Sequence, residues 1–130
     1  MTRVYVDAEA AAIDGSGGQP SLDPAAVRSL RFLAEAGNDV IIVAPDGPAV
    51  PEELRAVAAQ VVADVPARPT ELAWYLTTDV ERCTGTSARL RTVLIGAAPG
   101  NGSVHRCDAV ARDVQAAALE LLAREAMPPR

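Results

Sequence analysis

Two hydrophobic patterns alternate along the chain. Short unbroken runs of aliphatic and β-branched residues are typical of strands buried in a parallel sheet. Between them lie longer segments in which apolar residues recur every three or four positions, as expected for helices that bury one face. The runs that predict strands are residues 3–6, 40–43, 61–65, 72–77 and 90–95.

The predicted helices have recognisable start and stop signals. Asp23-Pro24 opens the first helix, with Asp as N-cap and Pro in the first turn, and Gly37-Asn38 closes it. A second helix is expected to begin at Pro51 and to run to about residue 59. A third is expected to be capped by Asp108 and to end near residue 125. Its predicted inner face consists of Val110, Val114, Ala117, Leu121 and Leu122.

Strands that alternate with helices predict an α/β fold. We expect a Rossmann-like three-layer sandwich, with helices on both faces of a mostly parallel sheet. The sheet would have five strands, or six if residues 104–107 add a short one. The glycine-rich segment 10–21 predicts a loop or short hairpin beside the end of the first strand. A chain of 130 residues without an internal repeat predicts a single domain, 1–130.

Composition and charge exclude some partners. The net charge is −5, all twelve basic residues are Arg, and no basic run occurs, so nucleic acid is not expected as a partner. No apolar stretch approaches the roughly 20 residues of a transmembrane helix, so no membrane partner is expected. The N-terminus lacks the features of a signal peptide, and we therefore expect a cytoplasmic protein. The Ala-rich, Lys-free composition is typical of a GC-rich bacterial genome.

The two cysteines, Cys83 and Cys107, are not expected to form a disulfide in a cytoplasmic protein. Together with His105 they could be considered for zinc, but a structural zinc site needs four ligands and only one close pair is present. We expect buried or partly buried thiols instead.

Two carboxylates follow the first predicted strand, at Asp7 and Glu9. In open α/β sheets, ligands bind outside the carboxyl ends of the strands. An acidic residue at this position therefore faces the expected binding crevice. The glycine loops lack the Gly-x-Gly-x-x-Gly and Gly-Lys-Ser/Thr patterns of nucleotide-binding loops.

Several segments resemble the haloacid dehalogenase (HAD) superfamily of mostly phosphate-transferring enzymes. Val6-Asp7-Ala8-Glu9 resembles the family's Asp-x-Asp at the end of its first strand, and the glycine loop after it corresponds to the squiggle and flap. Segment 22–43 is similar to the family's first helix and second strand, and Arg68-Pro69 lies where Lys-Pro often occurs. Segment 74–79 resembles the strand that ends in Gly-Asp, and 91–96 the strand after it. The spacing leaves no room for a cap domain, so the chain is similar to the small capless type.

The resemblance implies phosphoryl transfer with Mg²⁺. Asp7 would be the nucleophile, Glu9 the general acid and base, and Arg68 a phosphate-binding cation in place of Lys. Asp7 and Asp79 would hold the metal, which is needed because carboxylate and phosphate repel each other.

The register of the last motif stays open. If Thr78 matches the family's glycine, Asp79 keeps the metal position and Cys83 takes that of the distal acid. If Thr77 matches it, Thr78 takes the metal position and Arg82 that of the distal acid. The first register weakens the metal site and the second destroys it.

Other departures indicate an eroded site. Glu9 is one methylene longer than the expected Asp, and Ala44 occupies the place of a Ser or Thr that would donate to phosphate. We therefore favour a catalytically impaired HAD-like protein that acts by binding or regulation. The alternative is a small Mg²⁺-dependent phosphohydrolase that uses Asp7 and Glu9.

The expected partner is a small phosphorylated molecule or another protein. The resemblance also implies a homo-oligomer, since capless members often complete their sites by assembling. A phosphoacceptor module of the receiver type ranks last, because Asp64 is poorly placed as acceptor and the chain has no Lys.

Overall fold

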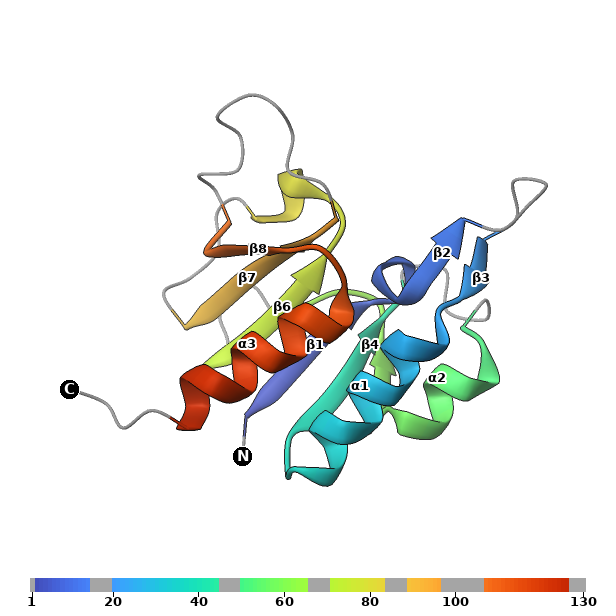
Figure 1. Cartoon of the computed structure of the whole chain (residues 1–130), viewed down its shortest axis with the longest axis horizontal. Coiled ribbons are helices and arrows are strands. Elements are labelled where there is room, and N and C mark those ends of the chain that lie inside the picture. The colour runs from blue at the N-terminus through green and yellow to red at the C-terminus, as the bar shows by residue number, and fades with distance from the viewer. Residues whose placement is uncertain are drawn as a thin grey trace.

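The computed structural model describes residues 2–14, 20–44, 50–65, 71–83, 89–96 and 107–126. Its centre is a six-stranded sheet in the order β5-β4-β1-β6-β7-β8, in which all neighbouring strands are parallel (Figure 1). The predicted α/β, Rossmann-like fold is therefore confirmed. The strands are β1 (Arg3–Asp7), β4 (Asp39–Val43), β5 (Gln60–Val62), β6 (Ala73–Thr77), β7 (Leu90–Ile95) and β8 (Ala109–Ala111).

β1 lies in the middle of the sheet, between β4 and β6. Val4 is level with Val40 of β4 and Trp74 of β6, and all three side chains are buried. Because successive side chains of a strand point to opposite faces, an unbroken apolar run requires that both faces be covered. This explains why the strand pattern in the sequence is continuous rather than alternating.

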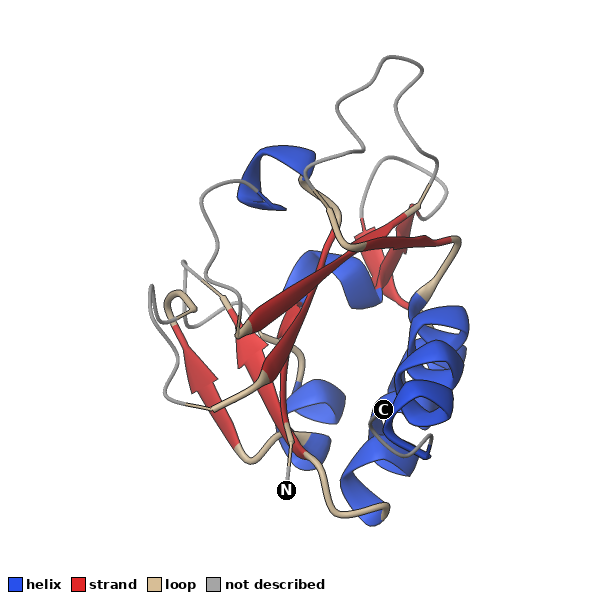
Figure 2. Ribbon diagram, turned by 90° about the vertical axis from the view of Figure 1, so that its left-hand side faces the viewer, coloured by secondary structure: helices blue, strands red, loops and turns tan. Residues whose placement is uncertain are grey.

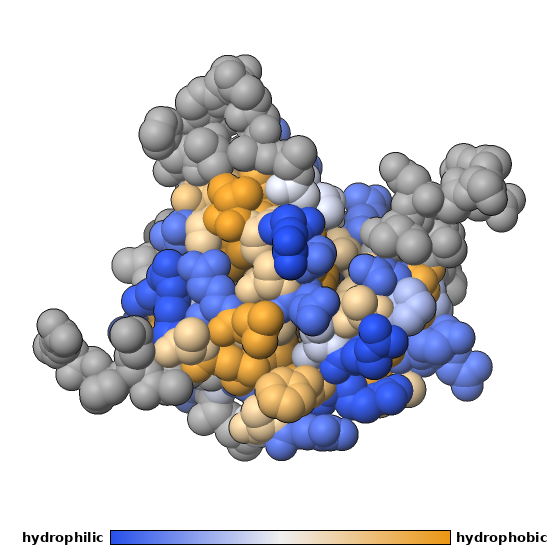
Figure 3. Space-filling view, in the orientation of Figure 1, coloured by the Kyte–Doolittle hydropathy of each residue, from blue (hydrophilic) through white to orange (hydrophobic). Residues whose placement is uncertain are grey.

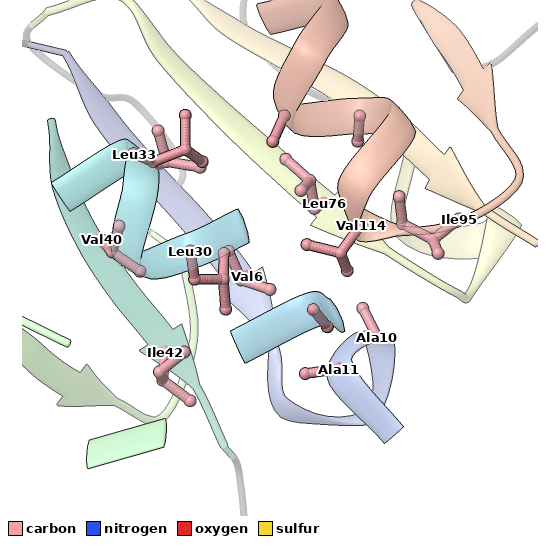
Figure 4. Close-up of a cluster of buried hydrophobic side chains, with 14 of the residues drawn as sticks. Val6, Ala10, Ala11, Leu30, Leu33, Val40, Ile42, Leu76, Ile95 and Val114 are labelled. Carbon is pink, nitrogen blue, oxygen red and sulfur yellow. The ribbon is translucent and has the colours of Figure 1, made fainter. Parts of the chain in front are cut away.

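α1 (Pro24–Glu35), α2 (Glu52–Val57) and α3 (Val114–Ala126) pack against one face of the sheet (Figure 2). Figure 4 shows side chains of α1 and α3 meeting those of the strands in this main core. Within the described residues, no helix is both long enough and apolar enough to span a bilayer. The core includes Val6, Leu30, Leu33, Ile42, Leu76, Ile95, Val114 and Leu121.

The opposite face of the sheet carries a second, smaller apolar cluster. Its buried members are Tyr5, Ile41, Val43, Ala73, Tyr75 and Leu90. The short 3-10 helix η3 (Val80–Cys83) belongs to this side, because its Arg82 side chain lies over the Tyr75 ring. Helical elements therefore flank the sheet on both sides, in a three-layer arrangement whose outer layers are unequal among the described residues.

A one-turn helix and a small hairpin follow β1. They are the 3-10 helix η1 (Ala8–Ala11) and the antiparallel pair β2 (Ala12–Asp14) and β3 (Pro20–Leu22). Ala10 and Ala11 are buried against the main core (Figure 4), and the Ala11 carbonyl accepts a hydrogen bond of 2.8 Å from the Asp23 amide. The expected hairpin is thus confirmed, and it is tied to the start of α1.

Apolar side chains also gather on the outer surface of the helical layer, as the space-filling view shows (Figure 3). Phe32 of α1 is 59% exposed and Leu119 of α3 is 62% exposed. The two helices are neighbours in the layer.

The end of the chain differs from the prediction. α3 begins at Val114, and the segment before it forms the edge strand β8. Asp108 does not cap the helix: its carboxylate accepts from the Thr92 amide at 2.7 Å and so ties the start of β8 to β7. Asp113 is the cap, since its Oδ1 accepts from the Ala116 amide at 2.8 Å. Val110, expected on the inner helix face, is 39% exposed in β8.

The sixth strand was also expected earlier in the chain, at residues 104–107. Residues 104–106 lie outside the described part, and the strand is found at Ala109–Ala111. Two other elements are shorter than expected: α2 ends at Val57 and β5 at Val62. Among the described strands, β5 lies at the edge of the sheet and pairs with β4 alone, so only one neighbour supports its extension by hydrogen bonds.

The expectation of unpaired thiols is wrong, because Cys107 is disulfide-bonded. Cys107 directly precedes β8, which pairs with β7, and η3, which ends at Cys83, also contacts β7. Segments distant in sequence are therefore brought to the same part of the sheet, which spacing along the chain does not reveal. His105, considered as a zinc ligand, lies outside the described residues.

Candidate functional site

Asp7 lies at the carboxyl end of the central strand, as predicted. It is the last residue of β1, is level with Val43 of β4, and is only 8% exposed. Successive strand residues alternate between faces, so Asp7 points to the same face as Tyr5, which is the face of the smaller cluster. A carboxylate buried this deeply needs hydrogen-bond donors around it.

Two hydroxyl groups from β6 supply those donors. The Tyr75 hydroxyl donates to Asp7 Oδ1 at 2.7 Å, and Thr77 Oγ1 donates to Asp7 Oδ2 at 2.6 Å. Tyr75 and Thr77 are two residues apart and therefore share a face of β6. The parallel register, which places Tyr5 level with Tyr75, brings that face beside Asp7. Both carboxylate oxygens are thereby held by neutral donors.

The Thr77 hydroxyl is part of a longer chain of hydrogen bonds. It accepts from the Asp79 amide at 3.1 Å, which leaves its proton directed to Asp7. The Asp79 carboxylate in turn accepts from the Glu81 amide at 3.0 Å. Asp79 is therefore the residue that caps η3 and orders the turn after β6.

Arg82 of η3 places a cation beside this network. Its guanidinium carbon lies 5.6 Å from the centroid of the Tyr75 ring. Its Nη2 donates to Asp64 Oδ1 at 2.6 Å, and the same oxygen accepts from the Val65 amide at 2.8 Å. Arg82 thus connects the segment after β5 with the face of β6 that holds Asp7.

The electrostatics of the site follow from burial and from these contacts. Burial raises the pKa of the Tyr75 hydroxyl well above its usual value, and the hydrogen bond to Asp7 raises it further. Burial lowers the pKa of the Arg82 guanidinium, but the acidic groups around it outweigh that effect and raise the pKa overall. These groups are Tyr75, Asp7, Asp64 and Asp79.

The other predicted site residues are less closely placed. Glu9 lies in η1, two residues beyond Asp7, and its side chain is exposed. Arg68 lies outside the described residues. Ala44, buried at the end of β4, brings no side-chain donor to the position where phosphate would need one. Within the part of the chain that the structure describes, Asp7 is thus placed beside β6 and η3, and no phosphate-binding side chain lies at the Ala44 position.

The donor set fits Mg²⁺ poorly. Mg²⁺ needs near-octahedral oxygen ligands, usually one or two carboxylates with waters. Both oxygens of Asp7 already accept hydroxyl protons, the Asp79 carboxylate caps η3, and a guanidinium lies beside them. In the part of the chain that the structure describes, no three His, Cys, Asp or Glu residues are grouped as a metal site would require.

Sequence reasoning did not identify Tyr75 and Arg82 as partners of Asp7. Tyr75 is hidden in an apolar strand, where its ring fits the core pattern, and only its hydroxyl reaches the site. The one available signal was the pair of hydroxyl-bearing residues, Tyr75 and Thr77, on one face at the end of a strand.

No protein-family model matches the chain, and no curated protein resembles it significantly in sequence. Solved structures do share its architecture. D,D-heptose 1,7-bisphosphate phosphatase from B. bronchiseptica, complexed with magnesium and phosphate, aligns with a TM-score of 0.68 at 11% identity, over 95% of this chain and 99% of that one. The D,D-heptose 1,7-bisphosphate phosphatase from Burkholderia thailandensis aligns with a TM-score of 0.59 at 13% identity, over 94% and 99%.

A HAD family hydrolase from Streptomyces avermitilis also aligns, with a TM-score of 0.59 at 14% identity, over 92% of this chain and 86% of that one. Identities this low show the fold alone. The three alignments agree with the fold that the resemblance implied, and they extend over nearly the whole chain. The chain therefore has the fold of the HAD superfamily.

Proposed function

We propose that this is a HAD-like protein whose phosphoryl-transfer site is eroded, so that it acts by binding or regulation rather than by catalysis. The observation that carries the proposal is the hydrogen bonding of the Asp7 carboxylate. Both of its carboxylate oxygens accept hydrogen bonds from buried hydroxyls, at 2.7 and 2.6 Å.

These hydrogen bonds oppose nucleophilic attack. A carboxylate attacks phosphorus through a lone pair, and each hydrogen bond withdraws electron density from the oxygen that accepts it. The attacking oxygen must also be brought against an anionic group, which requires fixed positive charge or donors around the phosphate. Ala44 contributes no side-chain donor, and Asp79 is committed to capping η3.

The proposed ligand is a small phosphorylated molecule or a protein segment that docks at the carboxyl end of β1. Arg68, which lies outside the described residues, is proposed to contact an anionic group of that ligand. Association of the chain with further copies of itself is also part of the proposal, and size-exclusion chromatography with light scattering tests it directly.

Catalysis is tested with a generic aryl phosphate in the presence of Mg²⁺. The parent and Asp7→Asn are expected to release the aryl alcohol at the same rate, close to the buffer background. Because Asn is nearly isosteric with Asp, the comparison removes the nucleophile with little change in shape. Turnover by the parent that Asp7→Asn abolishes would establish the alternative, a Mg²⁺-dependent phosphohydrolase with Asp7 as nucleophile and Glu9 as acid and base.

Binding is tested separately by thermal unfolding with a phosphate mimic such as tungstate. A rise in Tm that depends on the mimic concentration supports an anion-binding site that survives without catalysis. A matched titration with Glu9→Gln reports whether the exposed carboxylate after Asp7 affects that affinity.

A further inference from the structure

We propose that Arg82 is the resident counter-cation of the Asp7 site and that it removes the need for a divalent metal there. The inference rests on the proposed function, because it explains how the carboxylate site stays intact without the metal that phosphoryl transfer would need. It deepens that proposal by stating which cation the site uses.

The Arg82 guanidinium lies over an aromatic ring that contacts Asp7. Arg82 lies 5.6 Å from the centroid of the Tyr75 ring, and the hydroxyl of that ring donates to Asp7 at 2.7 Å. A cation over an aromatic face is attracted by the negative face of the ring. The ring therefore holds the guanidinium on the same side of the sheet as Asp7.

Arg82 and its ion-pair partner Asp64 are buried to different degrees. The Arg82 side chain is 29% exposed, whereas that of Asp64 is 72% exposed. An ion pair with so exposed a carboxylate contributes little by itself. Partial burial of a guanidinium is unfavourable unless negative charge compensates it, and so exposed a partner compensates it only in part.

Two further carboxylates lie on this side of the sheet, those of Asp7 and Asp79. Arg82 lies over the Tyr75 ring, whose hydroxyl donates to Asp7, and the Arg82 amide donates to the Asp79 carbonyl at 3.0 Å, so Asp7 and Asp79 are acidic residues next to it on this side of the sheet. Asp7 is 8% exposed, and the two side chains that donate to it within the described residues are both neutral. Arg82 thus supplies the positive charge that the two hydroxyls cannot supply. A divalent cation added to the site would be repelled by the guanidinium.

The experiment exchanges the resident cation for a ligand. Arg82→Asp removes the guanidinium and adds a carboxylate to a region that already holds Asp7, Asp64 and Asp79. Isothermal titration calorimetry with MgCl₂ is expected to show no saturable binding to the parent at millimolar Mg²⁺. The variant is expected to bind Mg²⁺ at least about tenfold more tightly, because clustered carboxylates favour a hard cation.

Two further variants make the result specific. Arg31→Asp gives the same change of charge at an exposed position on α1, which packs on the opposite face of the sheet, and is expected to leave Mg²⁺ binding like that of the parent. In Arg82→Asp, the additional change Asp7→Asn is expected to abolish the gained affinity.

If Arg82→Asp does not fold, a second variant still tests the role of Arg82 as counter-cation. Arg82→Gln keeps much of the side-chain length and adds no charge, so it is the gentler variant. Mg²⁺ is expected to raise the Tm of Arg82→Gln and to leave that of the parent unchanged, because only the variant lacks its counter-cation.

Saturable Mg²⁺ binding by the parent at least as tight as that of the Arg82 variants would overturn the inference, as would the absence of any gain in folded Arg82→Asp or Arg82→Gln. Its failure is separable from that of the proposed function. Mg²⁺ binding by a parent without turnover contradicts only the inference. Turnover in EDTA by a parent that does not bind Mg²⁺ contradicts only the proposed loss of catalysis.

Discussion

Thr77 has two hydrogen-bonding duties at the end of β6. Its hydroxyl donates to Asp7 at 2.6 Å and accepts from the Asp79 amide at 3.1 Å. The residue is fully buried, so water cannot replace either hydrogen bond. Thr77 therefore connects the candidate site to the turn that leads to η3 through hydrogen bonds.

Thr77→Val tests the contribution of these two hydrogen bonds. Valine has nearly the same shape but leaves Asp7 Oδ2 without its donor and the Asp79 amide without its acceptor. We expect the free energy of unfolding to fall by about 1–3 kcal/mol, the usual cost of an unsatisfied buried polar group. Urea unfolding followed by circular dichroism measures it. Thr78→Val, at the exposed neighbouring position, is the control and is expected to change stability by less than about 0.5 kcal/mol.

Tyr75 makes stability depend on alkaline pH. Burial and the hydrogen bond to Asp7 raise the pKa of its hydroxyl above the usual value of 10.0, which the unfolded chain retains. Above that pH the unfolded chain loses a proton that the folded chain keeps, so stability is retained below about pH 10 and falls as the pH rises toward the folded-state pKa.

Tyr75→Phe isolates this contribution, because it keeps the ring and removes the ionisable group. The stability advantage of the parent over Tyr75→Phe is expected to shrink by up to about 1.4 kcal/mol per pH unit above about pH 10. Urea titrations between about pH 8 and about pH 11 provide the measurement. A difference between the two proteins that stays constant across this range would show that the hydroxyl titrates alike in both states.

At the scale of single elements, local chemistry decided some boundaries and sheet pairing decided others. α1 starts and stops where the sequence indicates: Asp23 accepts from the Ala25 amide at 3.0 Å, and Gly37 after the helix has a φ of +99°. That positive φ suits glycine, which carries no side chain to clash. For α3 the predicted cap was Asp108, whereas Asp113 caps the helix in the structure.

Asp113→Ala tests the assignment of the α3 cap. The change removes the acceptor of the Ala116 amide, and the free energy of unfolding is expected to fall by about 1 kcal/mol. Thermal and urea unfolding measure the loss. Gln115→Ala, at an exposed position in the first turn, is the matched control and is expected to be nearly neutral. Equal effects of the two changes would argue against Asp113 as the cap.

At the scale of the whole molecule, the sheet has two different faces. α1, α2 and α3 cover the larger cluster, whereas the smaller cluster and η3 lie on the face to which Asp7 points. The candidate site therefore lies at the carboxyl end of β1, on the face whose described cover is the smaller of the two. On this face the short element η3 brings Arg82 over Tyr75 of β6.

The sequence by itself determined the strand and helix order, the cap of α1, the parallel sheet and the position of Asp7 at the carboxyl end of β1. These features depend on local periodicity and on capping residues, which act over a few positions along the chain. The tertiary structure alone decided that Tyr75 and Thr77 face Asp7, that Arg82 lies over Tyr75, that Asp108 joins β8 to β7, and that Cys107 is disulfide-bonded. Each of these contacts joins segments distant in sequence, and strand register, which no local pattern encodes, decides which side chains meet.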